Sequence, residues 1–427
     1  TESDVVRAAE ERFTRRFEEY FGQPADTPVV TLAEARDTLQ KIENKTGVKS
    51  ALIYVTFVPP MVAADEATNA GSARQALNSK LQNSEDQLEL LIVTSKGVAI
   101  RKRVDGTTRK QVLKVADEFR TGVTNVRDQR GYISPARQLY RWLVAPLEAD
   151  LKEQGIQNLA FIMDTGLLSI PLAALYDGQE FLVEKYNVGL LSSLSLTDRG
   201  YQDIKNMQVL AMGAATFTDQ KSLPSVPLEL SAITPSLWRG KSFLNNAFTL
   251  ANLKAQRQEQ PFGIIHLATH AVFLPGAAGN SYIQLWDTKL RLNELPLLGW
   301  NKPPVELLVL SACRTALGNE QSELGFAGLG VQAGVKSALG SLWFVSDEGT
   351  LGLMTGFYQE LKQAPIKAEA LRRAQVAMLK GQVRLEGGQL VSPNKSVPLT
   401  PELAKLGDKN FKHPYFWAGF TLVGSPW

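Results

Sequence analysis

Short apolar runs recur along the C-terminal two thirds of the chain, and each of them ends in small or polar residues. Runs that are apolar throughout are typical of strands buried on both faces of a parallel sheet. Segments with helical periodicity lie between most of them, at 228–238, 249–259, 348–362 and 366–380. This alternation predicts an α/β fold with an open, mostly parallel sheet sandwiched by helices. The predicted strands are "NLAFIMD" (158–164), "MQVLAMG" (207–213), "FGIIHLAT" (262–269), "VELLVLS" (305–311), "SALGSLW" (337–343) and a last one, "FWAGFTLVG" (416–424).

The N-terminal part has a different sequence pattern, which predicts two helices followed by β-rich runs. Apolar residues predict a helix over 3–21, and Thr31 with Glu34 has the spacing of a capping box that opens a second helix over 31–45. Strands are expected at 51–58 and 88–93, then a hairpin turn, a helix over 108–121, and a further helix that Pro146 kinks or splits. We place a boundary near residue 130. It separates an N-terminal α+β subdomain (1–130) from the main domain (131–427).

Two long polar segments interrupt this pattern. The stretch 59–87 is polar and punctuated by Pro and Gly, and we expect a mobile excursion there. The stretch 381–412 is rich in Gly, Pro and Lys and is predicted to be a loop.

Composition excludes several classes of protein. Of the 427 residues 44% are apolar, and the net charge is only +3, which does not fit a nucleic-acid binder or a disordered chain. A single cysteine excludes an internal disulfide and fits a reducing compartment, so we expect a cytoplasmic protein. No apolar stretch approaches the ~18 residues of a membrane-spanning helix, and no signal peptide is recognisable. The chain opens on Thr1 without Met, which suggests that it is a fragment of a longer protein and that upstream modules are missing from this sequence.

The only thiol, Cys313, follows directly on the apolar run "VELLVLS", and His270 follows "IIHLAT" in the same way. If the two strands are neighbours, both side chains leave the sheet at its carboxyl edge, where α/β folds place their chemistry. A nearby imidazole can stabilise a thiolate nucleophile and later protonate a leaving amine. A buried structural thiol and a core histidine are the alternative interpretation of these two residues.

Longer blocks around this pair resemble the CHAT family, caspase-related peptidases of the same clan as separases and clostripains. "HLATHAVF" is followed by "LVLSACRTALG", with Cys313 43 positions after His270. The resemblance runs from about residue 130 to the C-terminus, and the region before it is similar to that of cyanobacterial members. The other blocks, in family order, are "DTGLLSIPLAALYDG" (164–178), "LGFAGLGVQAGVKSALGSLWFVSDEGT" (324–350), "FYQEL" (357–361), "AEALRRAQ" (368–375) and "HPYFWAGFTLVG" (413–424).

The resemblance implies a caspase-like fold and a role for each matching residue. Cys313 is expected to be the nucleophile and His270 the catalytic histidine, whereas His266 is expected to be structural. The backbone amides of Cys313 and Ala271 would form the oxyanion hole. The family usually has Gly where this chain has Ala271, and a backbone with positive φ there would strain an alanine.

Two aspartates are candidates for substrate binding. Asp347 matches the position at which separase- and clostripain-like relatives bind a basic residue before the scissile bond, and Asp164 ends the strand "NLAFIMD" at the same expected edge. Carboxylates there would pair with Arg or Lys by charge-assisted hydrogen bonds. Both residues also precede or open predicted helices, so capping of helix N-termini is the competing interpretation.

The sequence therefore predicts a cysteine endopeptidase that cleaves after basic residues, with protein or peptide substrates, no cofactor and no metal. Regulation is expected through mobile loops (59–87, 276–282, 318–324 and 381–412), a partner, or an upstream repeat or sensor module. Two alternatives stay open. One is a catalytically silent caspase-like interaction module, and the other is an esterase or transferase that uses the same thiol. The N-terminal subdomain is interpreted as a degenerate partner of the catalytic sheet.

Overall fold

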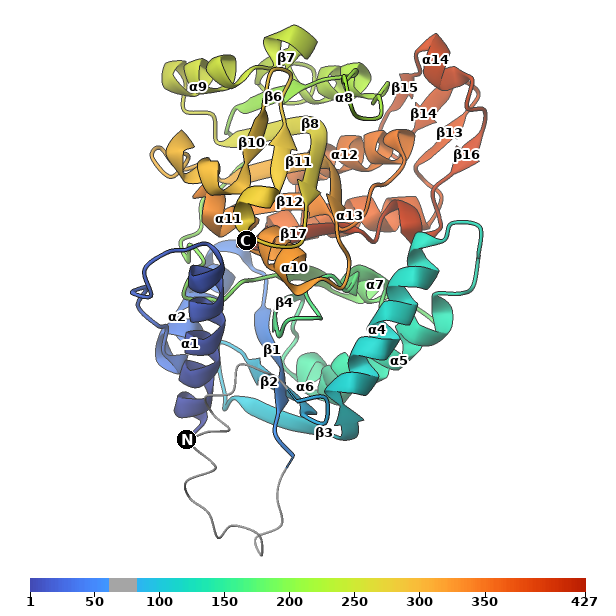
Figure 1. Cartoon of the computed structure of the whole chain (residues 1–427). Coiled ribbons are helices and arrows are strands. Elements are labelled where there is room, and N and C mark those ends of the chain that lie inside the picture. The colour runs from blue at the N-terminus through green and yellow to red at the C-terminus, as the bar shows by residue number, and fades with distance from the viewer. Residues whose placement is uncertain (61–82) are drawn as a thin grey trace, which may run out of the picture.

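The computed structural model describes residues 1–60 and 83–427, and its centre is one large twisted sheet between helices (Figure 1). In these described residues the sheet has thirteen strands, and its main path runs β10-β9-β8-β11-β12-β17-β5-β4-β1-β2-β3. The two further strands extend from β8, because β6 pairs with β8 and β7 pairs with β6. The predicted fold class, a mostly parallel α/β sheet sandwiched by helices, is confirmed.

The strands that carry the candidate site are central and parallel. Strand β8 pairs in parallel with β6 on one side and with β11 on the other, and β11 pairs in parallel with β12. All of them are buried along almost their whole length, as their uninterrupted apolar runs predict. The strands of this part are β5 (Asn187–Leu190), β6 (Val209–Gly213), β7 (Gly240–Leu244), β8 (Ile264–Phe273), β9 (Tyr282–Gln284), β10 (Lys289–Arg291), β11 (Leu307–Thr315), β12 (Ser337–Ser341) and β17 (Phe420–Gly424).

The helices of this part agree closely with the periodic segments of the sequence. The segment predicted at 348–362 is α12, and the segment predicted at 366–380 is α13. The helices of four residues or more are α7 (Leu182–Lys185), α8 (Val226–Ile233), α9 (Leu250–Glu259), α10 (Glu320–Ala327), α11 (Leu329–Ala333), α12 (Asp347–Leu361), α13 (Lys367–Leu379) and α14 (Pro401–Ala404).

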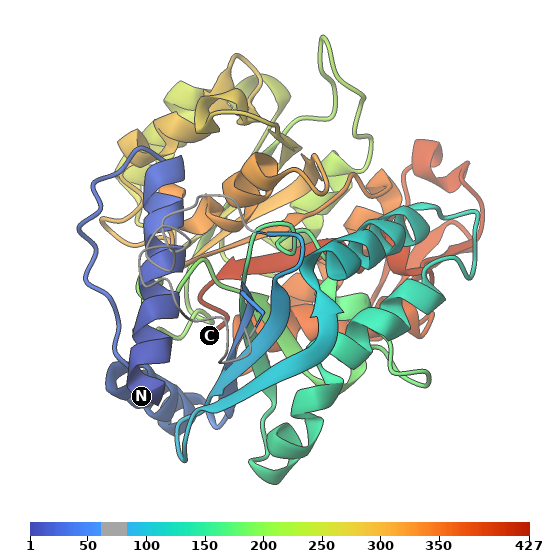
Figure 2. The same ribbon diagram turned by 60° about the horizontal axis from the view of Figure 1, so that its bottom comes forward.

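The N-terminal strands continue the same sheet. Strand β1 pairs in parallel with β4 and antiparallel with β2, so residues on both sides of position 130 share one sheet. Helices α1 and α4 flank these strands on opposite sides (Figure 2). The elements are α1 (Glu2–Tyr20), α2 (Leu32–Thr46), β1 (Ser50–Val58), β2 (Gln87–Val93), β3 (Ile100–Thr108), α4 (Arg109–Thr124), α5 (Ile133–Leu143), α6 (Glu148–Glu153) and β4 (Asn158–Met163).

The prediction of a loop over 381–412 is wrong. This stretch folds into a small antiparallel sheet with the order β15-β14-β13-β16, together with α14. Its strands have only two or three residues, so they offer no periodicity that a sequence pattern could reveal. The strands are β13 (Arg384–Glu386), β14 (Gln389–Val391), β15 (Ser396–Pro398) and β16 (Lys409–Asn410). Most of the excursion predicted at 59–87 lies outside the described residues.

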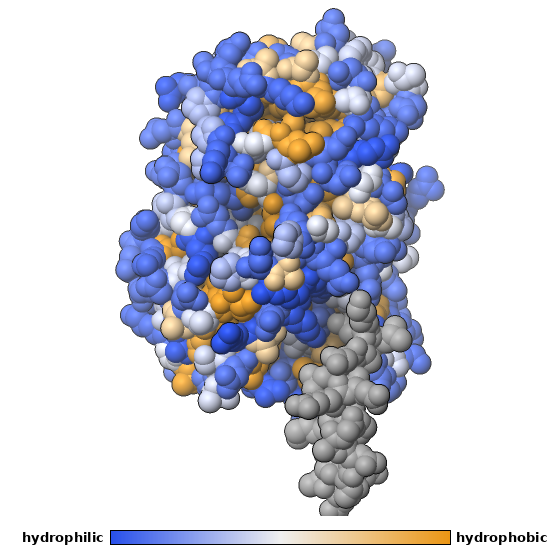
Figure 3. Space-filling view, turned by 60° about the vertical axis from the view of Figure 1, so that its left-hand side comes forward, coloured by the Kyte–Doolittle hydropathy of each residue, from blue (hydrophilic) through white to orange (hydrophobic). Residues whose placement is uncertain are grey.

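The buried apolar side chains form one connected core, which extends from Val6 in α1 to Trp427, the last residue of the sequence. The face of the molecule seen in Figure 3 is mainly hydrophilic, with apolar residues gathered at a few separate places. None of the helices in the described part of the chain combines the length and the hydrophobicity that crossing a bilayer requires.

Candidate active site

His270 and Cys313 lie on neighbouring parallel strands. In the ladder between β8 and β11, His270 pairs with Ala312, and Ala271 pairs with Cys313. The strands do not end where the sequence suggested, at 269 and 311, but continue to Phe273 and Thr315. The extension of β8 is held because its last residues also pair with β9 on the other side. Cys313 is therefore inside its strand rather than beyond it.

The two side chains point to opposite faces of the sheet. Successive residues of a strand alternate between the faces, so Ala312 and Arg314 share the side of His270 and Cys313 does not. The surroundings agree, because His270, Ala312 and Arg314 line one cavity of about 380 Å³ whereas Cys313 is fully buried elsewhere. The structure thus brings the two residues to adjacent strands and adjacent register positions, but it does not bring the thiol to the imidazole.

His270 is half-buried between two aromatic rings. Phe217 meets its ring edge-on at 4.9 Å between centroids, and Phe344 stacks on it at 5.8 Å. Its Nε2 lies 2.7 Å from the backbone oxygen of Lys221, and since a carbonyl only accepts, Nε2 carries the proton. Burial lowers the pKa of His270, and the positive charges of Arg314 and Lys221 lower it further. A neutral imidazole with a free Nδ1 can act as a general base.

Cys313 faces the helix α10. Gly340 and the ring of Phe326 lie beside the sulfur. A Cβ atom added to Gly340 would come within 3.1 Å of both Cys313 Sγ and the Phe326 ring. The thiol donates one weak hydrogen bond, 3.5 Å long, to the carbonyl oxygen of Leu310. Burial raises the pKa of the thiol to about 12. In this arrangement the sulfur is a protonated core side chain, and a thiolate would need a different environment.

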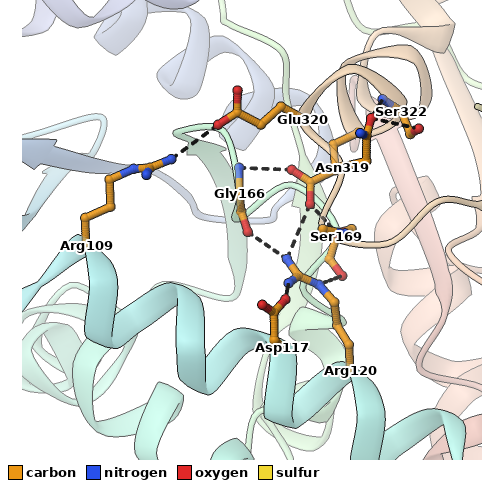
Figure 4. Close-up of polar contacts among 10 residues, drawn as sticks. Arg109, Asp117, Arg120, Gly166, Ser169, Asn319, Glu320 and Ser322 are labelled. Carbon is orange, nitrogen blue, oxygen red and sulfur yellow. Dashed lines mark hydrogen bonds and ion pairs between the residues drawn. The ribbon is translucent and has the colours of Figure 1, made fainter. Parts of the chain in front are cut away.

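A buried polar network holds α10 in place. Glu323 of α10 accepts hydrogen bonds from the amide of Gly166 at 3.0 Å, from the Ser169 hydroxyl, and from the guanidinium of Arg120 at 3.3 Å. Arg120, on α4, also donates to the carbonyl oxygen of Gly166 at 2.6 Å and to Asp117 at 2.7 Å. Figure 4 shows these contacts between α4, the loop after β4 and α10. The helix that covers the thiol is thereby tied to the N-terminal part of the chain.

The two expected oxyanion donors, the amides of Ala271 and Cys313, belong to residues paired across the two strands. Among the described residues the only one other than glycine with positive φ is Asn245. Ala271 therefore has ordinary backbone geometry, and alanine in place of the usual glycine causes no strain here.

Asp347 is the first residue of α12, and the helix cap is its neighbour Ser346, whose hydroxyl accepts from the amide of Gly349. The Asp347 carboxylate accepts instead from the amide of Ser225, at 2.5 Å, just before α8 begins. Burial raises the pKa of Asp347 to about 6, and the nearby carboxylate of Glu229 adds to this effect. The carboxylate thus joins the start of α8 to the start of α12.

Asp164 lies far from His270. Four strands separate β4 from β8 in the sheet, which corresponds to roughly 24 Å at the usual spacing between strands. Its buried carboxylate accepts from the amide of Phe57 at 2.8 Å and forms ion pairs with Arg12 at 3.1 Å and Arg16 at 3.9 Å. The structure therefore places Asp347 on the side of His270, near α8, and places Asp164 in a separate ion-pair cluster with α1.

Comparison with known families identifies the chain. The model of the family described as CHAT domain matches residues 134–425. The chain belongs to the CHAT family. The match covers well over half of the sequence and confirms the resemblance that the residue blocks indicated. None of the curated protein sequences matches this CHAT protein significantly.

Three solved structures resemble this CHAT protein distantly. Two separase–securin complexes of Saccharomyces cerevisiae match with TM-scores of 0.46 and 0.45 at 8% and 9% identity, and cover 93% and 92% of this chain. The CHAT protein spans about a third of the matched chains, 32% and 31%. The complex of the pro- and mature domains of Porphyromonas gingivalis RgpB matches with a TM-score of 0.41 at 10% identity, over 74% of this chain and 77% of that one.

Sequence reasoning missed several residues around His270. Lys221, Tyr282, Arg314 and Phe344 line its cavity together with Ala271. Three of them lie outside the ends of the strands that carry His270 and Cys313, and the fourth, Arg314, follows the thiol directly. A larger open hollow, about 730 Å³, lies between residues 126–129 and the small sheet, and neither His270 nor Cys313 lines it.

His266, four residues before His270 on β8, is fully buried in a network of its own. Its Nε2 lies 2.7 Å from Glu229 of α8, and its Nδ1 lies 2.9 Å from the hydroxyl of Tyr358 of α12. These contacts fix both helices on the sheet, which agrees with the structural role that the sequence suggested. In the described residues no group of three His, Cys, Asp or Glu side chains is arranged to hold a metal ion.

Replacement of Asp347 by asparagine should stabilise the protein at neutral pH. A carboxyl whose pKa rises from 3.8 to about 6 on folding binds its proton more tightly in the folded state, so stability falls as pH rises between these values. Asp347→Asn should remove this fall and raise the free energy of unfolding at pH 7 by up to about 3 kcal/mol. Urea unfolding from pH 4 to pH 7 measures it. Asp219→Asn is the control, because the Asp219 side chain is 64% exposed; an unchanged pH profile in Asp347→Asn would refute the assignment.

Proposed function

We propose that this CHAT protein is a cysteine endopeptidase with Cys313 as nucleophile and His270 as general base and acid. The observation that carries the proposal is their placement on hydrogen-bonded parallel strands, at adjacent register positions, within a domain of the CHAT family. A core thiol has no need of a half-buried histidine with a lowered pKa on the next strand.

The chemistry needs only these two side chains, two amides and water. His270 takes the thiol proton, and the sulfur attacks the carbonyl carbon of the scissile bond. The amides of Cys313 and Ala271 would stabilise the oxyanion, and His270 then gives its proton to the leaving amine, which departs and leaves a thioester. Water, deprotonated by His270, attacks the thioester and releases the acid and the thiol.

We propose that the arrangement described above is a resting state. For the reaction, Cys313 has to turn from the α10 face toward His270, and the backbone at 311–313 is the place for this change. The ladder between β8 and β11 is already irregular between Leu310 and Ala312. Binding of substrate, of a partner, or of an upstream module would supply the free energy for the turn.

We propose cleavage after a basic residue, with Asp347 as the acidic group on the His270 side of the sheet. Asp164 does not enter this proposal, because Arg12 and Arg16 already neutralise it. The reducing compartment expected from the single cysteine would keep such a thiol active.

The buried thiol favours one other candidate, a catalytically silent interaction module. Its pKa of about 12 and its packing beside Phe326 are what a purely structural cysteine would show. Turnover of ester but not peptide substrates would instead point to an esterase or transferase.

A substrate panel separates these candidates. Fluorogenic peptides with Arg, Lys, Asp, Leu or Met before the scissile bond, and matched esters, are incubated with the wild type and with Cys313→Ala. We expect cleavage after Arg and Lys that is absent in Cys313→Ala. A resting enzyme can need a partner for activity. The wild type and Cys313→Ala are therefore also added to extract of the source cells, and the protein termini that cleavage creates are identified by sequencing. No difference in either setting would reject the peptidase and leave the silent module.

A further inference from the structure

The segment 214–225 lies between β6 and α8, and its residues 219–221 line the cavity that His270 also lines. The amide of Ala215 donates to Asn245 at 2.9 Å, and the amide of Ser225 donates to Asp347 at 2.5 Å. Between these ends, Gln220 donates to the hydroxyl of Tyr282 at 3.3 Å. The segment is therefore attached at several points along the cavity, and it touches both His270 and Asp347.

Lys221 is the residue of this segment that engages the site most closely. Its backbone oxygen accepts the hydrogen bond from His270 Nε2, at 2.7 Å. Its ammonium lies over the ring of Phe344, 5.6 Å from the centroid, within the range of a cation–π contact. The same ring stacks on the imidazole of His270. Lys221 therefore contacts the site twice. Its backbone carbonyl binds His270, and its ammonium group lies over the ring of Phe344.

Phe344 is well placed to receive a cation. Its ring lines the cavity, while its backbone oxygen accepts from the hydroxyl of Tyr415 at 3.0 Å, which fixes this stretch after β12. Lys221 forms no ion pair with any carboxylate of the described residues at 4 Å or less, so the ring is the group that holds its charge.

We propose that Phe344 forms the floor of a subsite for the cationic side chain of the substrate, which Lys221 occupies here as an internal ligand. This inference rests on the proposed function and makes it more specific. The basic residue would be recognised by direct contact with the aromatic ring that stacks on the catalytic histidine. The negative charge of Asp347 would attract the same residue without touching it. The segment 214–225 would have to move away before a substrate enters.

The first test uses the internal ligand and does not depend on catalysis. In a Cys313→Ala chain, the rate at which diethyl pyrocarbonate modifies His270 is measured by mass spectrometry. Lys221→Met, which keeps the length of the side chain but removes its charge, should raise this rate about 2- to 5-fold, the effect of losing one exposed cation–π contact. Phe344→Leu should raise it as much, and the double variant no further.

The matched control is Lys362→Met. Lys362 makes a similar contact, 4.3 Å over the ring of Trp238, away from the cavity. This variant should leave the rate at His270 unchanged. Phe344→Trp, which keeps an aromatic face, should behave like the parent chain and separates the effect of the ring from a loss of folding.

The second test replaces the internal ligand by a peptide. Two labelled peptides that differ only in lysine or norleucine are titrated into the Cys313→Ala, Lys221→Met chain and followed by fluorescence anisotropy. The lysine peptide should bind about 5-fold more tightly, and Phe344→Leu should abolish the difference. Equal binding of the two peptides, binding of neither, or a preference that survives Phe344→Leu would overturn the subsite.

These outcomes are distinct from failure of the proposed function. A lysine preference that depends on Phe344 in a protein without peptidase activity would keep the subsite and reject the peptidase. Cleavage after lysine that is unaffected by Phe344→Leu would keep the peptidase and reject the subsite.

Discussion

Alanine in place of Cys313 will abolish peptide cleavage, and alanine in place of His270 will reduce it nearly as far. A nucleophile and its base act as one unit, so each single variant should lose about 10⁴- to 10⁶-fold in kcat, and the double variant should lose no more than the worse of the two. Initial rates with a lysyl or arginyl peptide, under the condition in which the wild type is active, measure all three variants.

The control for these variants is another histidine outside the site. His413 caps the turn at Pro414–Phe416, where its Nδ1 accepts from the amide of Tyr415. Asparagine can keep this bond, so His413→Asn should retain wild-type kcat. Losses that add up in the Cys313/His270 double variant would mean that the two residues act separately, and the dyad would then be wrong.

Alanine in place of Glu323 will lower the free energy of unfolding by about 3–5 kcal/mol. The Glu323 side chain is fully buried and Arg120 is 5% exposed, so removal of the carboxylate leaves a guanidinium in the core with only part of its partners. Arg120→Ala should be about as costly. Burial raises the pKa of Glu323, and among the contacts that favour the charged carboxylate the charge of Arg120 has the largest effect. Urea unfolding of the full chain measures both variants.

Glu320 on the same helix provides the matched control. It pairs with Arg109 at 3.3 Å, but its side chain is 57% exposed, and such surface pairs contribute less than about 1 kcal/mol (Figure 4). Glu320→Ala should therefore change stability by less than that amount. If Glu323→Ala were no more costly than Glu320→Ala, the network would not hold α10 over the thiol.

Most of the fold followed from local patterns. The capping box of Thr31 and Glu34 opens α2 as predicted, and Pro146 lies in a 3₁₀ turn that separates α5 from α6. The fully apolar runs marked the central strands, because a parallel sheet buries both faces of each strand. Local sequence patterns did not predict the elements that form only because strands pair with one another. The two- and three-residue strands of the 381–412 region exist only through their partners.

The site was predictable in its residues but not in its arrangement. The sequence placed His270 and Cys313 directly after two apolar strands and required these strands to be neighbours, and in the structure they are paired. It could not reveal that both strands continue past them, since the extension of β8 depends on pairing with the short strand β9. Lys221 and Phe344 carried no signal, because their importance comes from the path of the segment 214–225 across the cavity. Asp164 shows the opposite case, a residue at a suitable strand end whose charge is balanced by arginines of α1, which the sequence pattern did not reveal.

The central claim is that a thiol turned into the core is nonetheless the nucleophile of His270. It is tested most directly by comparing two alkylating reagents on the native chain at pH 8, with mass spectrometry of the peptide that contains Cys313. At a pKa of about 12 only about one thiol in 10⁴ is ionised at this pH, so iodoacetamide should react very slowly. A lysyl or arginyl peptide chloromethyl ketone should modify Cys313 at least about 100-fold faster, relative to free cysteine, and His270→Ala should remove this advantage. Equal relative rates for the two reagents, or modification only after unfolding, would contradict the account.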